Sequence, residues 1–385
     1  MTLSSIQARH YDTDDPIVVS FDDGVICDIS PLESRSENVL VLAPGLVDVQ
    51  VNGYGGQEFN DPELTAEKVL QICLAMDRDG VTQFCPTFTT QSFELLRHSM
   101  ATVAQAIDEH ADIADRCTVL HLEGPYISDE DGPRGAHPLE HVRPPCWDEF
   151  QQLQSAARGK IGILTLSPEF PQAEQFIQQV VDSGVVVAIG HTAASSMQIT
   201  AAIDAGATMS THLGNGAHGT IRRHPNYIWD QIAADELTCS LIADGHHLPT
   251  SVIKSIIRAK TSERCVLVSD ITGMGGMPPG KYTSSGLGDV EVLENGRLVV
   301  PGQSQLLAGA SFPIGAGIAT LTENAGIDLG TAVDMASIGP ANIIKHELAP
   351  LEVDAGVDLV FFEIRDGKFV VHTTVNRGRI VYQAS

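Results

Sequence analysis

Two histidines near the middle of the chain, His191 and His212, have a spacing that suits metal chemistry. Each ends a short apolar run, at residues 185–189 and 207–211, and the segment between the runs has apolar residues at helical spacing. This order predicts a β–α–β unit with a histidine just past the carboxyl end of each strand. In parallel α/β proteins, functional sites lie at that end. We therefore expect the imidazoles to converge as metal ligands do, the alternative being two unrelated histidines.

Two acidic residues follow other predicted strands and would share the same face. Glu123 follows the third strand and Asp270 the eighth. One carboxylate and two imidazoles leave a coordination position open, which is typical of a catalytic rather than a structural zinc site. Such an ion lowers the pKa of a bound water molecule and polarises a carbonyl group, so the pattern indicates hydrolysis. Asp270, which is not needed as a ligand, is placed to act as a general base and then as an acid.

Plainer interpretations remain for several of these residues. Glu123 could cap a helix or pair with an arginine, and Asp270 could be an ordinary turn aspartate. His121 lies inside an apolar strand and is better explained as a core histidine than as a ligand. The adjacent His246 and His247 could both be loop histidines.

These residues would be positioned by strands and helices that alternate between residues 44 and 349. Eight apolar runs separated by helical patterns match the number of strands that closes a (β/α)8 barrel. An open, doubly wound sheet is the alternative fold. The runs begin at residue 46 and continue at 82–85, 118–122, 162–166, 185–189, 207–211, 238–242 and 265–269.

Both chain ends are rich in short strands separated by Asp and Gly turns. The economical interpretation is that the two ends pair with each other and that the barrel is inserted between them. We therefore predict an α/β fold. It consists of a TIM-type (β/α)8 catalytic barrel over residues 44–349 and a small β-sandwich domain formed by residues 1–43 and 350–385.

Length and composition exclude several classes of protein. A chain of 385 residues suits one large barrel with a smaller unit. A formal net charge of −26, with no Lys/Arg-rich tract, disfavours binding to nucleic acid or to anionic membranes. No segment resembles a signal peptide or a membrane span, and the seven cysteines show no CxxC pairing. We expect a soluble cytoplasmic protein with reduced thiols.

Short motifs in a fixed order extend over nearly the whole chain. They are PGLVDVQVNGYGG (44–56), HLEGPYIS (121–128), GAHP (135–138), AIGHTAAS (188–195), THLGNG (211–216), IADGHHLP (242–249), VSDITG (268–273) and LAGAS (307–311). As a set they resemble the amidohydrolase superfamily and, within it, the N-acetylglucosamine-6-phosphate deacetylases. The resemblance implies a metal-dependent hydrolase that removes the acetyl group from N-acetylglucosamine 6-phosphate, giving glucosamine 6-phosphate and acetate.

The resemblance also implies roles for the strand-end residues. Glu123, His191 and His212 would bind the divalent metal ion, and Asp270 would be the acid/base. Two-metal members of the superfamily carry His-x-His after the first strand, where this chain has Gln50-Val51-Asn52. Amides are poor transition-metal ligands beside imidazole, so we expect one ion, most simply zinc.

Substrate contacts follow from the same resemblance. His137, Asn215, Gly216 and His247 match substrate-binding positions of the family. Arg223 matches the arginine that reaches the sugar phosphate across a homodimer interface, and a guanidinium suits phosphate geometry. The alternative for Arg223 is a solvated loop.

Departures from the family pattern surround the expected substrate position. The sequence Ala217-His218-Gly219 replaces a bulkier residue after Gly216, a Gly/Pro-rich loop follows Asp270, and Ala310 stands where serine is usual. These departures leave open another N-acetyl amino sugar, of galactosamine type or unphosphorylated, or another small amide. A non-enzymatic sugar-phosphate sensor is the remaining alternative. The roles of His218 and His246 stay open.

Overall fold

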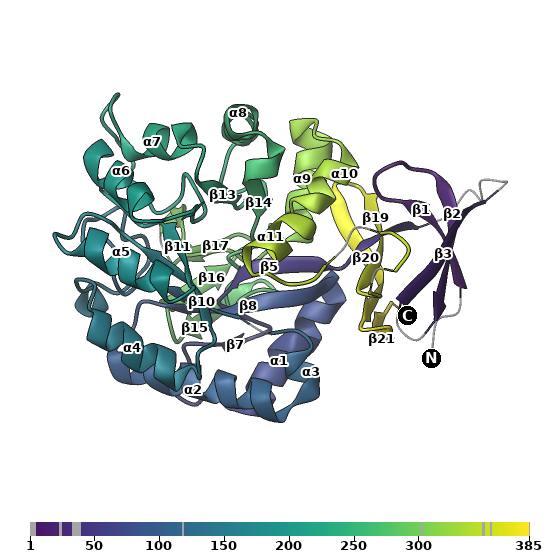
Figure 1. Cartoon of the computed structure of the whole chain (residues 1–385), viewed down its shortest axis with the longest axis horizontal. Helices are drawn as coiled ribbons and strands as arrows, with labels where there is room; N and C mark the ends of the chain where they lie inside the picture. Colours follow the sequence, from purple (N-terminus) through teal and green to yellow (C-terminus); the bar gives the residue numbers. More distant parts are fainter. Residues whose placement is uncertain are drawn as a thin grey trace.

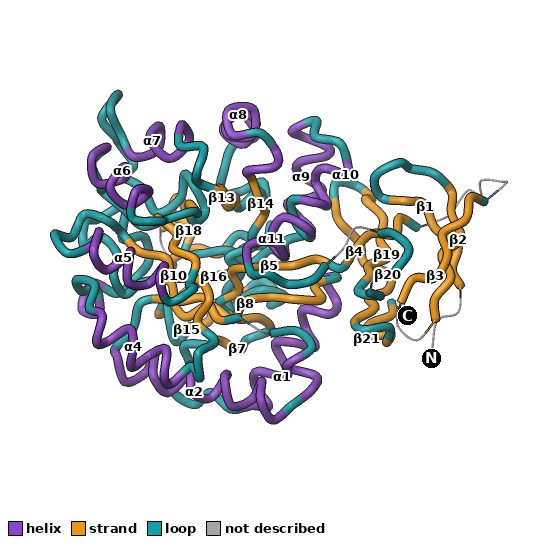
Figure 2. The backbone as a smooth tube through the Cα atoms, in the orientation of Figure 1, coloured by secondary structure: helices purple, strands orange, loops and turns teal. Residues whose placement is uncertain are grey.

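The computed structural model describes residues 5–22, 25–32, 40–117, 119–301, 303–348, 351–354 and 356–384. Figure 1 shows a large unit ringed by helices and, beside it, a smaller sheet near which both chain termini lie. In Figure 2 the strands of the large unit lie inside and its helices lie outside. Among the described residues, no helix combines the length and the apolar character that a membrane crossing requires.

The large unit is built on an eight-stranded sheet whose strands follow one another in chain order, with parallel neighbours. A doubly wound sheet would reverse its order at a switch point, so the predicted barrel is confirmed and the alternative fold is wrong. The strands are β5 (Leu46–Val51), β8 (Val81–Thr89), β9 (Leu120–Glu123), β10 (Ile161–Leu166), β11 (Val186–Ile189), β12 (Met209–Ser210), β13 (Thr238–Leu241) and β14 (Cys265–Leu267).

The barrel closes at the carboxyl ends of its first and last strands. The Asn52 amide N–H donates to the carbonyl of Ile271 at 2.8 Å. At the opposite end, the amide of Val47 donates to the carbonyl of Ala336 at 2.9 Å, so backbone from a later helical segment continues the pairing there. Closure at the carboxyl end brings the residues after β5 beside those after β14.

The first two outer helices start at residues whose side chains cap them. Thr65 accepts a hydrogen bond from the amide of Lys68, and Ser92 accepts one from Leu95, which satisfies amides that a helix start leaves unpaired. The helices are α1 (Ala66–Met76), α2 (Phe93–Glu109), α3 (Ala111–Ala114), α4 (Trp147–Ala156), α5 (Ala173–Asp182), α6 (Ser196–Asp204), α7 (Tyr227–Ala233), α8 (Thr250–Lys260), α9 (Gly315–Thr320), α10 (Leu329–Asp334) and α11 (Ile338–Ile343).

The barrel has an apolar cluster of its own, to which seven of its strands or strand ends each contribute one buried side chain. Packing of this kind fills the interior of such barrels, so that the barrel is a core and not a pore. The cluster consists of Val49, Cys85, Ile163, Ala188, Met209, Ile242 and Val268.

The smaller unit is one seven-stranded sheet made from both chain ends, in the order β21-β20-β19-β4-β1-β2-β3. The predicted pairing of the two ends is therefore confirmed. The division at residues 43/44 and 349/350 stays a prediction, and the second boundary lies outside the described residues. The strands are β1 (Ser5–His10), β2 (Pro16–Asp22), β3 (Val25–Pro31), β4 (Val41–Pro44), β19 (Leu359–Arg365), β20 (Lys368–Asn376) and β21 (Arg379–Gln383).

A four-stranded antiparallel sheet, which the sequence did not predict, is inserted between β14 and α9. Its strands are short, and β15 alternates half-buried and exposed positions up to the buried Ser284, so no apolar run marks it in the sequence. The strands are β15 (Gly280–Ser284), β16 (Gly288–Val292), β17 (Leu298–Val300) and β18 (Gln303–Leu307). We call this sheet the insert. A two-strand hairpin, β6 (Gly53–Tyr54) and β7 (Gln57–Glu58), follows β5.

Candidate active site

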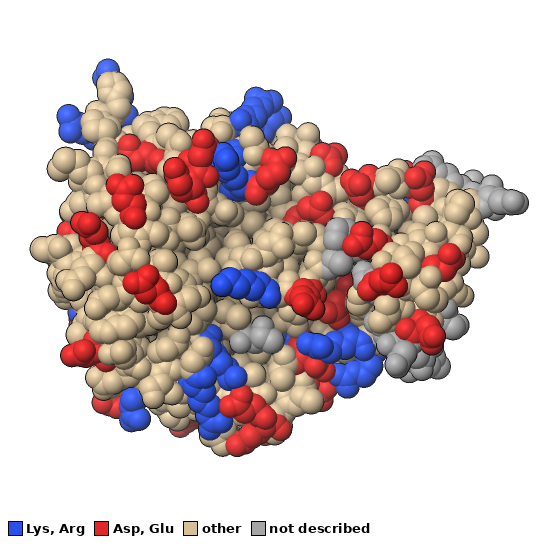
Figure 3. All heavy atoms as spheres, in the orientation of Figure 1, with Lys and Arg blue, Asp and Glu red and all other residues tan. Residues whose placement is uncertain are grey.

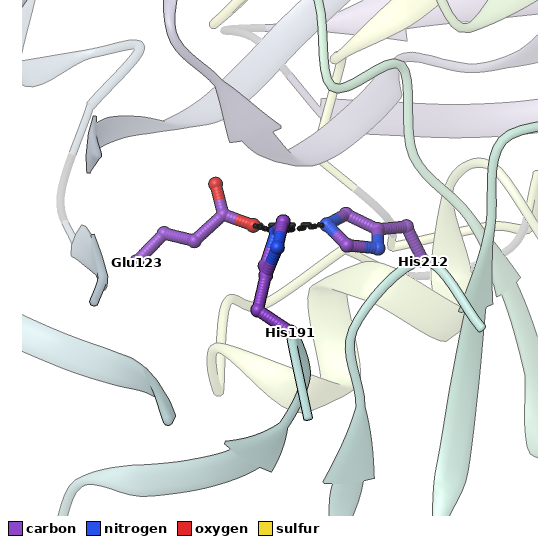
Figure 4. Close-up of side chains that lie close together, drawn as sticks. All are labelled: Glu123, His191 and His212. Atoms are coloured by element: carbon purple, nitrogen blue, oxygen red, sulfur yellow. Dashed lines mark hydrogen bonds and ion pairs between the residues drawn. The ribbon is translucent and has the colours of Figure 1, made fainter. Parts of the chain in front are cut away.

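Three buried side chains from neighbouring strand ends converge on one point (Figure 4). Glu123 is the last residue of β9, and His191 and His212 follow β11 and β12. The Nε2 atoms of His191 and His212 lie 3.2 and 3.0 Å from Glu123 Oε1, and 3.1 Å from each other. The structure thus brings together the three residues that the sequence assigned to a metal.

The hydrogen bonding of His191 tests whether these residues fit a cation. Its Nδ1 lies 2.9 Å from the carbonyl oxygen of Pro133, which can only accept, so Nδ1 carries the proton and donates. In the neutral ring, Nε2 then presents a lone pair toward Glu123 and His212. A ligand histidine usually has its other ring nitrogen fixed in this way. A carboxylate and imidazole lone pairs directed at one small space fit a divalent metal ion, which this buried cluster suggests.

Electrostatics within the cluster favour the charged form of the carboxylate. Burial by itself raises the pKa of Glu123, but its contacts with the imidazoles of His191 and His212 hold that pKa well below its usual value. Glu123 is therefore ionised over the whole physiological range.

Asp270 lies beside the cluster and is held by two side-chain amides, one from the end of β5 and one from the residue after it. Gln50 Nε2 donates to Asp270 Oδ1 at 3.0 Å, and Asn52 Nδ2 donates to the same oxygen at 2.8 Å. Gln50 Nε2 also donates to Glu123 Oε1 at 2.8 Å, so one amide bridges the two carboxylates. Burial, followed by the charge of Glu123, raises the pKa of Asp270 to about 6. A carboxylate with such a pKa is suited to exchanging protons near neutral pH.

His137 reaches the site from the loop after β9, and its ring centre lies 4.3 Å from that of His191. Its Nδ1 accepts from the amide N–H of Thr90 at 3.4 Å and lies 2.8 Å from Thr90 Oγ1. Because Nδ1 accepts, the neutral ring carries its proton on Nε2. Burial, followed by the charge of His191, lowers the pKa of His137 to about 3. His137 is therefore a neutral hydrogen-bond donor.

The two histidines of the IADGHHLP motif have different surroundings. His247 Nδ1 donates to Asp244 Oδ2 at 2.8 Å, and the ring lines the cavity of the site. His246 stacks on Phe312, with ring centres 4.9 Å apart, and lines a different cavity that contains neither the cluster nor Asp270. Of this pair, only His247 is placed to contact a ligand of the cluster site.

A cavity of about 280 Å³ joins most of the predicted site residues. Its lining also includes Gly286 and Leu287, which the sequence did not identify because the insert was not predicted, and residues 307–309 of the LAGAS motif, to which the sequence assigned no contact. From the prediction, the lining contains Glu123, His137, His191, His212, Asn215, Gly216, His247 and Asp270. From the insert and the segment directly after it, the lining contains Gly286, Leu287, Leu307, Ala308 and Gly309.

Arg223 does not line this cavity. It lies in the segment 217–225, which is exposed from Gly219 onward. Asn226 holds the end of this segment, because its Nδ2 donates to the carbonyls of Arg222 and Arg223 at 2.8 and 3.1 Å. The surface view in Figure 3 shows basic groups on the loop that projects near α7, on a face that carries both acidic and basic side chains elsewhere. His218, in the same segment, has its Nδ1 2.9 Å from Tyr227 Oη and its Nε2 3.1 Å from Glu130 Oε2. These contacts tie the segment to its neighbours in the fold.

His121, the remaining histidine near the cluster, is part of the core. Its Nδ1 lies 3.0 Å from the Val49 carbonyl oxygen and its Nε2 lies 2.8 Å from Thr165 Oγ1. Both ring nitrogens are therefore engaged, as expected for a satisfied core histidine.

Comparison with known proteins agrees with the geometry. The model of the amidohydrolase family matches residues 41–381. An N-acetylgalactosamine-6-phosphate deacetylase of Escherichia coli O157:H7 is 30% identical over 364 residues, covering 94% of this chain and 91% of that protein. The human N-acetylglucosamine-6-phosphate deacetylase is 29% identical, covering 96% and 89%. Among solved structures, a mutant N-acetyl-D-glucosamine-6-phosphate deacetylase from Mycobacterium smegmatis, in complex with N-acetyl-D-glucosamine-6-phosphate, superposes with a TM-score of 0.86 at 26% identity, covering 98% and 99%.

Proposed function

The chain belongs to the amidohydrolase family, and we propose that it removes the acetyl group from N-acetylglucosamine 6-phosphate, giving glucosamine 6-phosphate and acetate. The observation that carries the proposal is one cavity containing a buried carboxylate, two imidazoles and a separate carboxylate with a raised pKa. Relatives with this deacetylase activity in their names, such as the human protein, align over nearly the whole chain.

We propose that Glu123, His191 and His212 hold one divalent ion and that this ion is zinc. When bound, the ion would lower the pKa of a water molecule and polarise the amide carbonyl of the substrate. The neighbouring amides, Gln50 and Asn52, already donate hydrogen bonds to carboxylates, and their oxygens are weak ligands for transition metals. This arrangement supports a site for a single ion.

In the proposed reaction, Asp270 moves the proton. Its Oδ1 is held by Gln50 and Asn52, and its Oδ2 would take a proton from the water that attacks the amide carbon. A carbon–oxygen bond forms, and the carbonyl oxygen gains charge that the Nε2–H of His137 is placed to stabilise. Asp270 then gives the proton to the sugar nitrogen as the carbon–nitrogen bond breaks. The products are acetate and the free amine.

We propose that the sugar is held by Asn215, Gly216 and His247, and that its phosphate is bound by Arg223 of a second copy of the chain. Arg223 is exposed, and the adjacent surface carries large apolar side chains, with Met197 81% and Trp229 58% exposed. Exposed apolar groups of this kind favour contact with another protein surface. A homodimer would bury them and would supply a cation to a cavity whose charged groups are otherwise dominated by carboxylates.

Mixing two inactive variants tests the shared site. R223A and D270N homodimers should both be impaired. In a mixed dimer, one site contains the intact Asp270 of one chain and the intact Arg223 of the other. Random exchange should therefore restore about one quarter of the sites. If equal mixtures recover no activity while sedimentation confirms exchange, Arg223 does not act across an interface.

The reaction itself is tested by acetate release from purified protein. We expect release from N-acetylglucosamine 6-phosphate that disappears after chelation and returns with zinc. N-acetylgalactosamine 6-phosphate and unphosphorylated N-acetylglucosamine should be run in parallel. Faster turnover of the galactosamine epimer would move the assignment to that sugar. Equal turnover of the unphosphorylated sugar would show that the phosphate group is not needed for recognition. No release from any of the three would reject the deacetylase assignment.

A further inference from the structure

The insert forms one wall of the active-site cavity. Gly286 and Leu287 reach the cavity from the turn between β15 and β16, and Leu307 reaches it from the end of β18. Other lining residues come from the barrel, in the loops after β9, β12 and β13. The cavity is therefore enclosed by the barrel and the insert together.

The insert contributes apolar side chains to the lining, Leu287 and Leu307. The barrel loops supply the hydrogen-bonding side chains His137, Asn215 and His247, together with the apolar Ile242. A phosphorylated sugar needs hydrogen-bonding partners for its hydroxyl and phosphate groups, and its acetyl methyl group needs apolar surroundings. On the premise of the proposed function, we infer that Leu287 and Leu307 form the acyl subsite, which receives the methyl of the acetyl group and limits the length of the acyl chain.

Buried hydrogen bonds hold the turn that carries Leu287 against the barrel. Glu58, on β7, is 8% exposed, and its two carboxylate oxygens accept from Ser284 Oγ at 2.6 Å and from the amide of Gly286 at 3.2 Å. Ser284 Oγ in turn accepts from the amide of Leu287 at 3.0 Å. Hydrogen bonds to a buried carboxylate are stronger than neutral ones, so the position of Leu287 is well defined.

The space behind Leu287 is also filled. A methyl group placed on Gly309 would lie 3.8 Å from Leu287 Cδ1 and 2.7 Å from Thr272 Cγ2. Thr272 is fixed in turn, because its amide and its hydroxyl both donate to the carbonyl of Ala310 at 3.0 Å. Leu287 itself packs against the apolar cluster of the insert, so it has little room to withdraw from a longer acyl chain.

A fixed apolar wall discriminates by size. One additional methylene in a hydrophobic pocket typically changes kcat/KM by about 10- to 200-fold. The wild-type protein should therefore hydrolyse N-acetylglucosamine 6-phosphate at least about tenfold more efficiently than the N-propionyl analogue. Shortening Leu287 should reduce this ratio, mainly by improving the reaction of the longer substrate.

The experiment measures kcat/KM for N-acetyl, N-propionyl and N-butyryl glucosamine 6-phosphate with wild-type protein, L287A, L307A and V290A. Val290 is fully buried in the core of the insert and does not line the cavity, so V290A controls for general loosening of the insert. We expect L287A and L307A each to lower the acetyl-to-propionyl ratio about tenfold, and V290A to leave it unchanged.

The possible failures are distinguishable. If wild-type protein hydrolyses none of the three amides, the proposed function is wrong. If it hydrolyses the acetyl substrate but both leucine variants keep the wild-type ratio, the acyl subsite lies elsewhere. Equal loss of efficiency for all three acyl groups would instead place the leucines against the sugar ring and would also overturn the inference. If V290A changes the ratio as much as L287A does, the selectivity comes from the rigidity of the insert as a whole and not from contact with Leu287 and Leu307, and the inference is wrong.

Discussion

Replacing Asp270 with asparagine separates proton transfer from the rest of the site. In the wild-type protein, Oδ1 accepts from Gln50 at 3.0 Å and from Asn52 at 2.8 Å. An asparagine whose oxygen keeps these two hydrogen bonds presents its NH2 group where the proposed proton acceptor stood. The shape of the site is then retained. In place of the second carboxylate oxygen stands an amide nitrogen, which donates hydrogen bonds and cannot take a proton.

Two magnitudes follow for D270N. Loss of a positioned acid/base lowers kcat by about 10²- to 10⁴-fold. In metal-free protein, the pKa of Asp270 is about 6 against an ordinary 3.8. Because the folded-state pKa is raised, wild-type Asp270 favours the fold below about pH 4 and loses that contribution as the pH rises through 6. At 1.36 kcal/mol per unit, the loss is roughly 3 kcal/mol. The asparagine of D270N does not titrate, so the variant should not show this pH-dependent loss of stability.

The assays are steady-state acetate release at saturating zinc and urea unfolding of metal-free protein at pH 4 and pH 8. We expect D270N to be nearly inactive with wild-type metal content, and to gain stability relative to wild type between the two pH values. Wild-type kcat in metal-loaded D270N would falsify the assignment of Asp270 as acid/base. A difference in unfolding free energy that does not change with pH would contradict the reasoning about its burial.

Three further substitutions have defined outcomes. Gln50→Leu removes the amide that joins Asp270 to the metal cluster, so metal affinity and kcat should each fall about 10- to 100-fold in a zinc titration and a rate assay; unchanged values would make the bridge irrelevant. Burial raises the pKa of Asp48 to about 7, so D48N should gain stability over wild type as the pH rises from 5 to 8.5 in urea unfolding, and a pH-independent difference would contradict this. Arg116→Met leaves the carboxylate of Asp77 buried without its 2.7 Å partner and should cost about 3 to 5 kcal/mol in the same assay at pH 7, whereas a loss below about 1 kcal/mol would mean that the pair is dispensable.

The barrel and the convergence of Glu123, His191 and His212 could be predicted because their signals are local and repeated. Each barrel strand is a short apolar run, and the residue after the run faces the site whatever the details of the loops. His191 and His212 could thus be paired from the sequence without knowing how far apart their side chains lie. The 3.1 Å between their Nε2 atoms is a consequence of adjacent strands, β11 and β12.

The insert could not be predicted in the same way. Its strands are three to five residues long, and β15 contains Lys281 and Thr283 at exposed positions, so no apolar run marks it. Its stability depends on partners far away in the chain, such as the hydrogen bond between Ser284 and Glu58, which are 226 residues apart. Contacts of that kind leave no local pattern. The cavity wall that contains Leu287 was therefore missed along with the insert.

The backbone at the site also had no sequence signal, yet it explains how the fold directs these side chains. His191, His212 and Asp270 have φ values of +50°, +30° and +52°, in the left-handed region that residues other than glycine rarely adopt. Each such residue costs about 1 to 3 kcal/mol and persists only where its surroundings determine it. These residues follow the ends of β11, β12 and β14 by two or three positions, and their side chains line the cavity. The strain falls on the residues proposed for metal binding and proton transfer, whereas the insert contributes apolar surface to the same cavity. Substitutions in the insert should therefore change which acyl group is accepted and leave the proton chemistry of Asp270 unaltered.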